Sequence, residues 1–369
     1  MKILILTNNF GGLHSFRREV VQAVVDKGYR VSISAPVDFK THFFEELGCE
    51  IINTEHAWKG VNPLKDIGLV FRYRKILKRV NPDVVLSYTI KPNLYGGIAC
   101  QMCHIPQIAN ITGLGSAVEN PGILQIITKL LYRIGLRKAK TVFFQNKANM
   151  DFCERNRLVR RNKVLIPGSG VNLQHHTYQP YPSSDESLKF IFVSRLIREK
   201  GIDEYVGAAA KIMKSFPHVE FHILGRSEGQ YEETVRKMQT DGIVKYHGVV
   251  SDVRPYLGAC HCIVHPSFYP EGMSNVLLES CAAGRPVITT NRPGCGEIVE
   301  DGKTGFLVRA KDVDNLVEII ERFINLPYDQ KKQMGIAARE KVKKEFDRQI
   351  VVDAYLKEID TVIIKKKNK

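Results

Sequence analysis

The chain alternates short apolar segments with longer segments whose apolar residues recur every three or four positions. Short apolar runs are typical of buried strands, and the longer pattern is typical of amphipathic helices. We expect helices at 15–27, 69–80, 201–216, 231–242, 275–283 and 313–326. We expect strands at 2–6, 30–35, 50–53, 84–88, 107–111, 141–145, 189–194, 219–224, 244–247, 262–265, 286–289 and 305–308. This alternation predicts an α/β protein with parallel sheets covered by helices on both faces.

The alternation is interrupted at 171–185, a polar segment that contains two prolines and has no periodicity. We therefore expect two Rossmann-like, doubly wound domains, 1–170 and 186–345, joined by this linker. A last amphipathic helix within 346–369 is expected to pack back on the first domain and to end in a basic tail. Ligands of doubly wound sheets lie outside the carboxyl ends of the strands, so functional residues are expected in the loops that follow strands, facing a central cleft.

The net charge of the whole chain is +15 over 369 residues, and most of it belongs to the first half. Residues 1–177 hold 25 Lys and Arg against 12 Asp and Glu, whereas residues 178–369 hold 29 against 27. This asymmetry indicates an anionic partner, either a nucleic acid or a phospholipid surface. The basic residues of 71–79 and 126–138 are mixed with large apolar ones, and no nucleic-acid-binding motif is present, which favours an anionic membrane surface. The alternative is that both segments are ordinary sheet-covering helices with solvated basic faces.

The sequence contains no apolar run long enough to cross a membrane, and its first apolar segment is too short for a signal peptide. The eight cysteines are scattered, which favours free thiols in a reducing cytoplasm. Cys100-x-x-Cys103-His104 and Cys260-x-Cys262 could suggest zinc, but neither has a clear partner pair. We interpret them as structural cysteines and expect no metal.

Two loops that follow predicted strands carry the most informative chemistry. In 270–279, Pro-Glu-Gly-Met-Ser-Asn-Val-Leu-Leu-Glu, a glycine precedes a predicted helix whose N-terminus offers N–H groups to phosphate or sugar oxygens. Glu279, one turn into that helix, could accept the hydroxyls of a ribose. In 193–201, Arg195 and Lys200 flank a second strand end, where two cations could stabilise a departing diphosphate. Taken separately, each loop could also be an ordinary capped helix or a solvated basic turn.

Together these loops resemble the retaining GT-B glycosyltransferases of family 4. The family has Ser-Arg-Leu with Glu-Lys-Gly after a strand and Pro-Glu-Gly-x-x-Asn-x-x-x-Glu about seventy residues later, and both are present here in that order. The segment 301–308, Asp-Gly-Lys-Thr-Gly-Phe-Leu-Val, resembles the closing turn and strand of the family. The resemblance implies a GT-B fold and a retaining hexosyltransferase that uses a nucleotide-sugar as co-substrate, with no metal and no other cofactor.

The resemblance also implies roles for individual residues. Arg195, Lys200 and Glu271 are the implied catalytic group: the two cations hold the diphosphate, while Glu271 holds the donor sugar. The ribose is assigned to Glu279 and the uracil to the turn of Gly248 and Val250. The remaining donor contacts implied are Gly11, Gly12, Gly272, Met273, Ser274 and Asn275.

The first half resembles a narrower branch of the family that synthesises capsule, O-antigen and glycan-linked polysaccharide. This resemblance depends on Tyr-Thr-Ile-Lys-Pro-Asn-Leu-Tyr-Gly at 88–96, Asn-Ile-Thr-Gly-Leu-Gly-Ser at 110–116 and Phe-Arg-Arg-Glu at 16–19. The branch implies a UDP-sugar donor, a polyprenyl-diphosphate-linked acceptor and a cytoplasmic enzyme peripheral to the plasma membrane. The acceptor-side loops then include Lys91, Asn93, Thr112 and Gly113.

One feature of the sequence differs from the family pattern, and two alternative functions are considered. Many relatives carry a histidine in the first domain that faces the reacting sugar, and neither His14 nor His104 matches it. A UDP-N-acetylglucosamine 2-epimerase of the same fold is the first alternative, and an anion-binding protein for nucleic acid is the second. A dinucleotide-dependent dehydrogenase is disfavoured because no Gly-x-Gly-x-x-Gly occurs. Asp312-Val313-Asp314 is interpreted as a helix N-cap, not as a metal-binding Asp-x-Asp.

Overall fold

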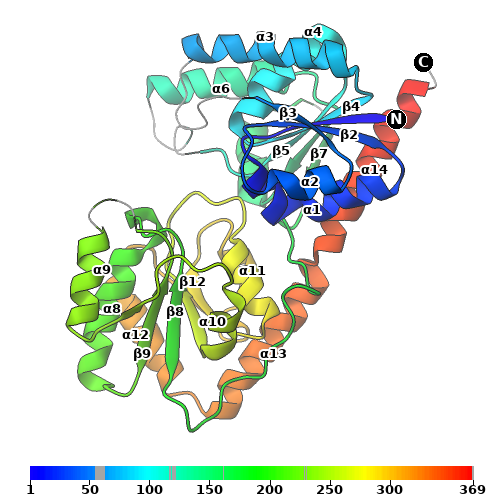
Figure 1. Cartoon of the computed structure of the whole chain (residues 1–369). Coiled ribbons are helices and arrows are strands. Elements are labelled where there is room, and N and C mark those ends of the chain that lie inside the picture. Colours follow the sequence, from blue (N-terminus) through cyan, green and yellow to red (C-terminus); the bar gives the residue numbers. More distant parts are fainter. Residues whose placement is uncertain are drawn as a thin grey trace. The chain divides into compact units, whose positions relative to one another are not determined.

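The computed structural model describes residues 1–54, 63–115, 118, 122–160, 162–227, 229 and 231–367. The chain divides into two compact units, one of residues 1–170 with 348–369 and one of residues 171–347. Each unit contains one parallel sheet with helices on both faces (Figure 1). The expected fold class is therefore confirmed as two doubly wound α/β domains.

The first unit has a seven-stranded sheet in the order β3-β2-β1-β4-β5-β6-β7. Its strands are β1 (Lys2–Leu6), β2 (Arg30–Ala35), β3 (Glu50–Asn53), β4 (Val84–Tyr88), β5 (Gln107–Ile111), β6 (Thr141–Phe144) and β7 (Asn162–Leu165). Its helices are α1 (Phe10–Asp26), α2 (Thr41–Glu46), α3 (Pro63–Val80), the π-helix η1 (Pro92–Gly96), α4 (Gly97–Cys103), α6 (Ile123–Gly135), α7 (Lys147–Arg155) and α14 (Arg348–Lys367).

The apolar runs of these strands are buried because alternate side chains enter different cores. In β1, Ile3 and Ile5 pack with α1, α2 and α14, whereas Leu4 and Leu6 pack with α3 and α4 on the other face. The helix α14 places the buried Tyr355 in the first of these cores. It continues through Lys367, so the residues expected to form a basic tail are helical as far as the structure describes them. Residues 368 and 369 lie outside the described residues.

The second unit has a six-stranded sheet in the order β10-β9-β8-β11-β12-β13. Its strands are β8 (Lys189–Val193), β9 (Glu220–Leu224), β10 (Lys245–Tyr246), β11 (Cys262–His265), β12 (Val287–Thr290) and β13 (Gly305–Val308). Its helices are the 3₁₀ helix η2 (Arg198–Lys200), α8 (Ile202–Ser215), α9 (Tyr231–Thr240), α10 (Arg254–Ala259), α11 (Asn275–Ala282), the 3₁₀ helix η3 (Gly296–Ile298), α12 (Val313–Ile324) and α13 (Tyr328–Glu345). The expected N-cap is confirmed, since Asp312 accepts from the backbone N–H of Asn315 at the start of α12.

The segment 171–185, expected to be a linker, lies within the second unit and packs on it. Arg285, which is fully buried, makes the main attachment. Its guanidinium donates to the carbonyl oxygens of Gln179 at 3.0 Å and Pro180 at 2.7 Å. It also donates to Gly258 at 2.6 Å, so one side chain joins this segment to the end of α10.

Both sheets reverse their strand order at one position, between β1 and β4 in the first unit and between β8 and β11 in the second. In doubly wound sheets the loops that follow the strands at such a position form the ligand crevice. In the second unit, these are the loops containing Arg195 to Lys200 and Pro266 to Ser274. In the first unit, they are the loops that follow Leu6 and Tyr88.

Candidate active site

A glycine brings the two loops of the second unit into contact. Gly201 has φ +82° and follows η2, and a Cβ at this position would lie 2.4 Å from the carbonyl oxygen of Pro266. Phe268 N–H also donates to the carbonyl oxygen of Glu199 at 2.9 Å. The loop after β8 and the loop after β11 are therefore packed backbone to backbone, which fixes the side chains that they carry.

The predicted catalytic group is brought together at this contact. Lys200 is buried, and its Nζ donates to Oε1 of Glu271. Tyr269 lies beside both predicted cations, with its ring centroid 4.8 Å from Lys200 Nζ and 5.8 Å from Arg195 Cζ. Cation–π contacts of this length stabilise a positive charge. Lys200 is thus held by a carboxylate and an aromatic ring, while Arg195 is exposed to solvent.

The loop 271–275 is supported from the next strand. Gly294, after β12, has φ +86°, and a Cβ there would lie 2.9 Å from Glu271 Cβ. Ser274 N–H donates to the carbonyl oxygen of Gly294 at 2.8 Å. Asn275 begins α11, Met273 is buried, and Gly272 lies between Glu271 and Met273. The predicted sugar-binding backbone therefore runs directly from Glu271 into the N-terminus of a helix, which favours oxygen ligands.

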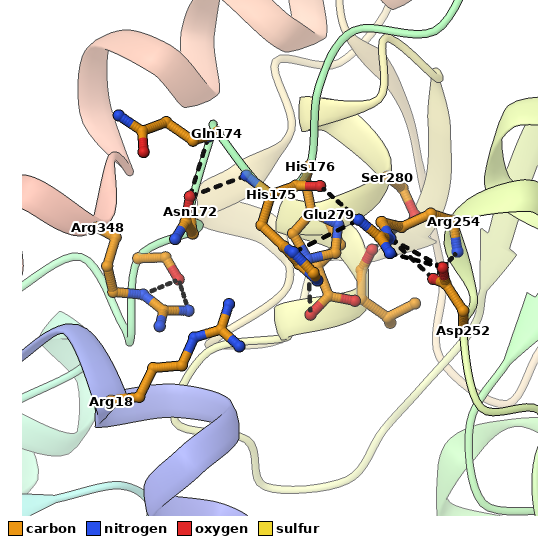
Figure 2. Close-up of polar contacts among 12 residues, drawn as sticks. Arg18, Asn172, Gln174, His175, His176, Asp252, Arg254, Glu279, Ser280 and Arg348 are labelled. Atoms are coloured by element: carbon orange, nitrogen blue, oxygen red, sulfur yellow. Dashed lines mark hydrogen bonds and ion pairs between the residues drawn. The ribbon is translucent and has the colours of Figure 1, made fainter. Parts of the chain in front are cut away.

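Glu279 lies in α11 and has a neighbour that the sequence did not indicate. Nε2 of His176 lies 3.9 Å from Oε1 of Glu279, and both side chains are mostly buried (Figure 2). His176 comes from the segment 171–185, where its N–H donates to the carbonyl oxygen of Asn172 at 2.8 Å. The carbonyl oxygen of the preceding residue, His175, accepts a hydrogen bond from Nη1 of Arg254 at 3.3 Å (Figure 2). The packed segment therefore borders the predicted ribose carboxylate.

A buried histidine lies at the end of β11, next to the catalytic loop. Both ring nitrogens of His265 lack a hydrogen-bond partner among the described residues, and the ring lies 6.2 Å from that of Phe192. Burial, together with the charge of Lys200, lowers the pKa of His265 to about 3. His265 is therefore neutral at physiological pH and does not add to the cationic charge of this site.

The turn predicted to hold the uracil follows β10. Gly248 has φ +66°, its carbonyl oxygen accepts from Gly225 N–H at 2.8 Å, and Val250 is half-buried. Just before it, Nε2 of His247 lies 2.9 Å from Nδ1 of His222. Burial lowers the pKa of His222, while partial desolvation and the neighbouring His222 lower the pKa of the more exposed His247. Two neutral rings therefore adjoin the turn.

Gly11 and Gly12 differ from the sequence expectation because they lie inside a helix and not in a loop before it. The helix α1 begins at Phe10, since Asn9 caps it by accepting from Gly12 N–H. Gly11 N–H donates to Oδ2 of Asp38 at 3.0 Å. Both backbone amides are thus bonded to side chains of the first unit, and a phosphate bound to Gly11 N–H would compete with Asp38. His14 also lies on α1.

The predicted acceptor-side residues lie at the carboxyl edge of the first sheet. Lys91 is buried and pairs with Asp66 of α3 at 2.8 Å. Asn93 donates to the carbonyl oxygen of Asn110 at 2.7 Å, which ties η1 to the end of β5. Thr112 and Gly113 follow β5 directly. The loop after β4 and the loop after β5 adjoin, since a Cβ on Gly115 would lie 2.9 Å from Ile90. Ser116, part of the motif at 110–116, lies outside the described residues.

Arg17 on α1 is a further polar residue at this edge. It is buried, and its Nε and Nη2 form no hydrogen bond within the described part of the chain. Its Cζ lies 5.7 Å from the ring centroid of Tyr88 at the end of β4. The motif at 16–19 gave the only sequence signal for this residue. Arg17 therefore adds a buried positive charge near the predicted acceptor loops.

In the part of the chain that the structure describes, the cysteines form no cluster with His, Asp or Glu side chains. Cys100, Cys260 and Cys262 are free and buried, and Cys103 is partly exposed. Within the described ranges, no group of three or more His, Cys, Asp and Glu side chains is arranged to hold a metal ion. Burial raises the pKa of the Cys260 thiol to about 12, which is typical of an unreactive structural cysteine.

Comparison with known proteins identifies matches in both halves of the chain. Residues 2–146 match the family model "Glycosyl transferase 4-like", and residues 177–341 match "Glycosyl transferases group 1". The chain is 26% identical to the N,N'-diacetylbacillosaminyl-diphospho-undecaprenol alpha-1,3-N-acetylgalactosaminyltransferase of Campylobacter jejuni, with 98% of this chain and 99% of the relative covered. It is 25% identical to a capsular polysaccharide biosynthesis glycosyltransferase of Staphylococcus aureus, with 84% and 87% covered.

Among solved structures, the chain is similar to an Anabaena protein solved in complex with UDP-glucose. The TM-score is 0.80, the identity is 20%, and 98% of this chain and 100% of that chain are covered. At this identity the similarity establishes the fold of both units.

Proposed function

Because the chain is a GT-B glycosyltransferase of family 4, a retaining family, we propose that it transfers a hexose or N-acetylhexosamine from a UDP-sugar to a polyprenyl-diphosphate-linked glycan. The observation that carries this proposal is the convergence of Arg195, Lys200 and Glu271 at the strand-order reversal of the second unit. The Campylobacter jejuni relative acts, by its name, on a sugar linked to diphospho-undecaprenol, which supports the acceptor class.

In this proposal the second unit binds the donor. Arg195 and Lys200 hold the diphosphate, Glu279 holds the ribose, and the turn of Gly248 and Val250 adjoins the uracil. Glu271 and the backbone of 272–275 hold the sugar. Because Lys200 is paired with Glu271, the donor diphosphate and the carboxylate share one ammonium group. The sugar and the leaving phosphate are thereby held on either side of the bond that breaks.

The two cations stabilise the charge that develops on the leaving diphosphate, so the proposed chemistry requires no metal. The leaving phosphate assists removal of the proton from the acceptor hydroxyl, which attacks from the same face of the sugar. The first unit binds the acceptor through the loops of Lys91, Asn93, Thr112 and Gly113. We place the enzyme in the cytoplasm, peripheral to the inner face of the plasma membrane, where such acceptors lie.

Donor consumption measured over a panel of UDP-sugars tests the proposal, with and without a polyprenyl-diphosphate-linked sugar. The expected result is that one UDP-sugar is consumed rapidly only when the acceptor is present, with retention of the anomeric configuration. Conversion of UDP-N-acetylglucosamine without any acceptor would contradict the transfer reaction and identify a 2-epimerase.

A further inference from the structure

The helix α6 directs most of its apolar side chains toward solvent. Ile123, Ile126, Leu130 and Ile134 are 78%, 67%, 51% and 43% exposed. Their spacing of three or four residues places them in one stripe along the helix. The residues that α6 buries are Thr128, Tyr132 and Gly135. This orientation is the reverse of an ordinary sheet-covering helix, whose apolar side faces the core.

The other basic segment considered from the sequence behaves differently. In α3, Tyr73 and Leu77 are completely buried, and among the large apolar residues of 66–80, whose burial the structure describes, only Ile67 and Phe71 are exposed. It is therefore mainly a sheet-covering helix with a solvated basic face. Among the described helices of the first unit, α6 is the better candidate for an interfacial helix.

A basic pocket lies at the C-terminal end of the stripe. It has a volume of about 590 Å³ and is lined by Arg133, Glu154, Arg157, Val159, Arg160 and Lys163. Arg133 is adjacent in sequence to Ile134, the last residue of the stripe. Glu154 is paired with Lys163 at 2.8 Å, so three arginines remain to give the pocket a net positive charge. Their charge is complementary to a phosphate group.

We propose that α6 and this pocket form a surface that docks on an anionic phospholipid bilayer. The stripe enters the boundary between headgroups and acyl chains, and the pocket binds the phosphate of a lipid headgroup. Because α6 follows β5 in a parallel sheet, its first turn lies at the carboxyl edge of the strands, as do Thr112 and Gly113. The surface rests on the proposed function in one respect: it would bring the acceptor loops to a lipid-linked acceptor.

Vesicle flotation tests the surface without any substrate. The vesicles are phosphatidylcholine alone and an equimolar mixture of phosphatidylcholine and phosphatidylglycerol. The stripe variant is Ile126→Gln with Leu130→Gln, and the pocket variant is Arg157→Glu with Arg160→Glu. The controls are Phe39→Gln, which removes an exposed aromatic residue outside the stripe and the pocket, and Lys237→Glu with Lys344→Glu in the second unit. All four variants change exposed residues, and an unchanged melting temperature verifies their folding.

We expect the wild type to bind the anionic vesicles preferentially, and less strongly at high salt. The stripe and pocket variants should each lower that binding by roughly ten-fold or more, whereas both controls should bind like the wild type. Equal binding to both vesicle types, or unchanged binding of both test variants, would overturn the proposal. So would preferential binding to RNA, or a dimer that the stripe variant dissociates while its vesicle binding is unchanged.

Turnover separates this surface from the proposed reaction. The stripe variant should retain turnover with a water-soluble, short-chain diphosphate acceptor and lose it with a long-chain acceptor embedded in anionic vesicles. Equal loss with both acceptors would show that α6 has a catalytic or folding role and would overturn the docking surface. If the wild type binds vesicles as expected but uses neither acceptor, the proposed reaction fails while the surface stands.

Discussion

The ammonium group of Lys200 and the carboxylate of Glu271 form an ion pair that joins two loops 71 residues apart in the sequence. The ring of Tyr269 lies against the same ammonium group, so Lys200 is fixed from two sides. A cation held in this way needs little reorganisation when charge develops on a leaving group.

Loss of either predicted cation should lower kcat more than it affects donor binding. Arg195→Ala and Lys200→Ala should each reduce kcat by roughly 10²–10³-fold, because their contribution is larger in the transition state than in the bound substrate. Glu271→Ala should also lower kcat. Steady-state kinetics measures the effect, with Arg198→Ala as the control, an exposed arginine in the same turn. Raised KM with an intact kcat in both cation variants would show that the cations only anchor the donor.

Glu279→Ala should chiefly raise the donor KM. The ribose that we assign to Glu279 does not change its bonding during transfer, so the variant weakens ground state and transition state alike. The measurement is the dependence of turnover on donor concentration. His176→Ala is the companion variant and should raise KM by a smaller factor, because it perturbs only a neighbour of Glu279. A fall in kcat at unchanged KM for Glu279→Ala would contradict the ribose assignment.

Turnover should persist in the presence of a strong chelator. In the proposed mechanism, Arg195 and Lys200 provide the positive charge that a divalent cation supplies in many other nucleotide-sugar enzymes. The experiment compares initial rates in EDTA with rates in added magnesium or manganese. Activity lost in EDTA and restored by either metal would show that the leaving-group chemistry has been assigned wrongly.

The free energy of unfolding should fall as the pH drops below about 6.5, partly because of His265. Its folded pKa of about 3 lies below its ordinary value of 6.5, so in this interval the unfolded chain binds a proton that the folded chain does not. At pH 5 this histidine should destabilise the fold by about 2 kcal/mol relative to pH 7. His265→Phe should remove that difference in urea unfolding at the two pH values. His42→Phe, a change at an exposed histidine, should leave it unaltered.

Arg285→Met should destabilise the second unit by about 3 kcal/mol or more, because several buried or partly buried carbonyl oxygens lose their donor. Arg309→Met, which changes an arginine with a mostly exposed side chain, is the matched control. Urea unfolding of both variants measures the difference. A loss no larger than that of the control would show that water replaces the guanidinium at those carbonyl groups.

The sequence predicted the strands of both sheets well because their apolar runs are short, continuous and bounded by polar residues. It did not predict β7, whose Asn162 and Lys163 interrupt the apolar pattern at a sheet edge, or α13, which is rich in charged residues. The loops of Arg195 and Glu271 could be predicted as functional because each follows a predicted strand of a doubly wound sheet. The contact between Arg285 and Gln179 could not be predicted, because these residues are 106 positions apart and no local sequence pattern indicates that they meet.

The helix that completes the first sheet's covering is synthesised only after residues 171–347. Val351, Tyr355 and Ile359 of α14 are buried in a core that contains residues of β1, β2, β4, β5 and β6. On the ribosome, the second unit can therefore form its core while the first unit still exposes the apolar surface that α14 covers in the folded protein. A chain truncated before residue 348 would therefore lack the apolar side chains that fill this core, although both sheets would be complete.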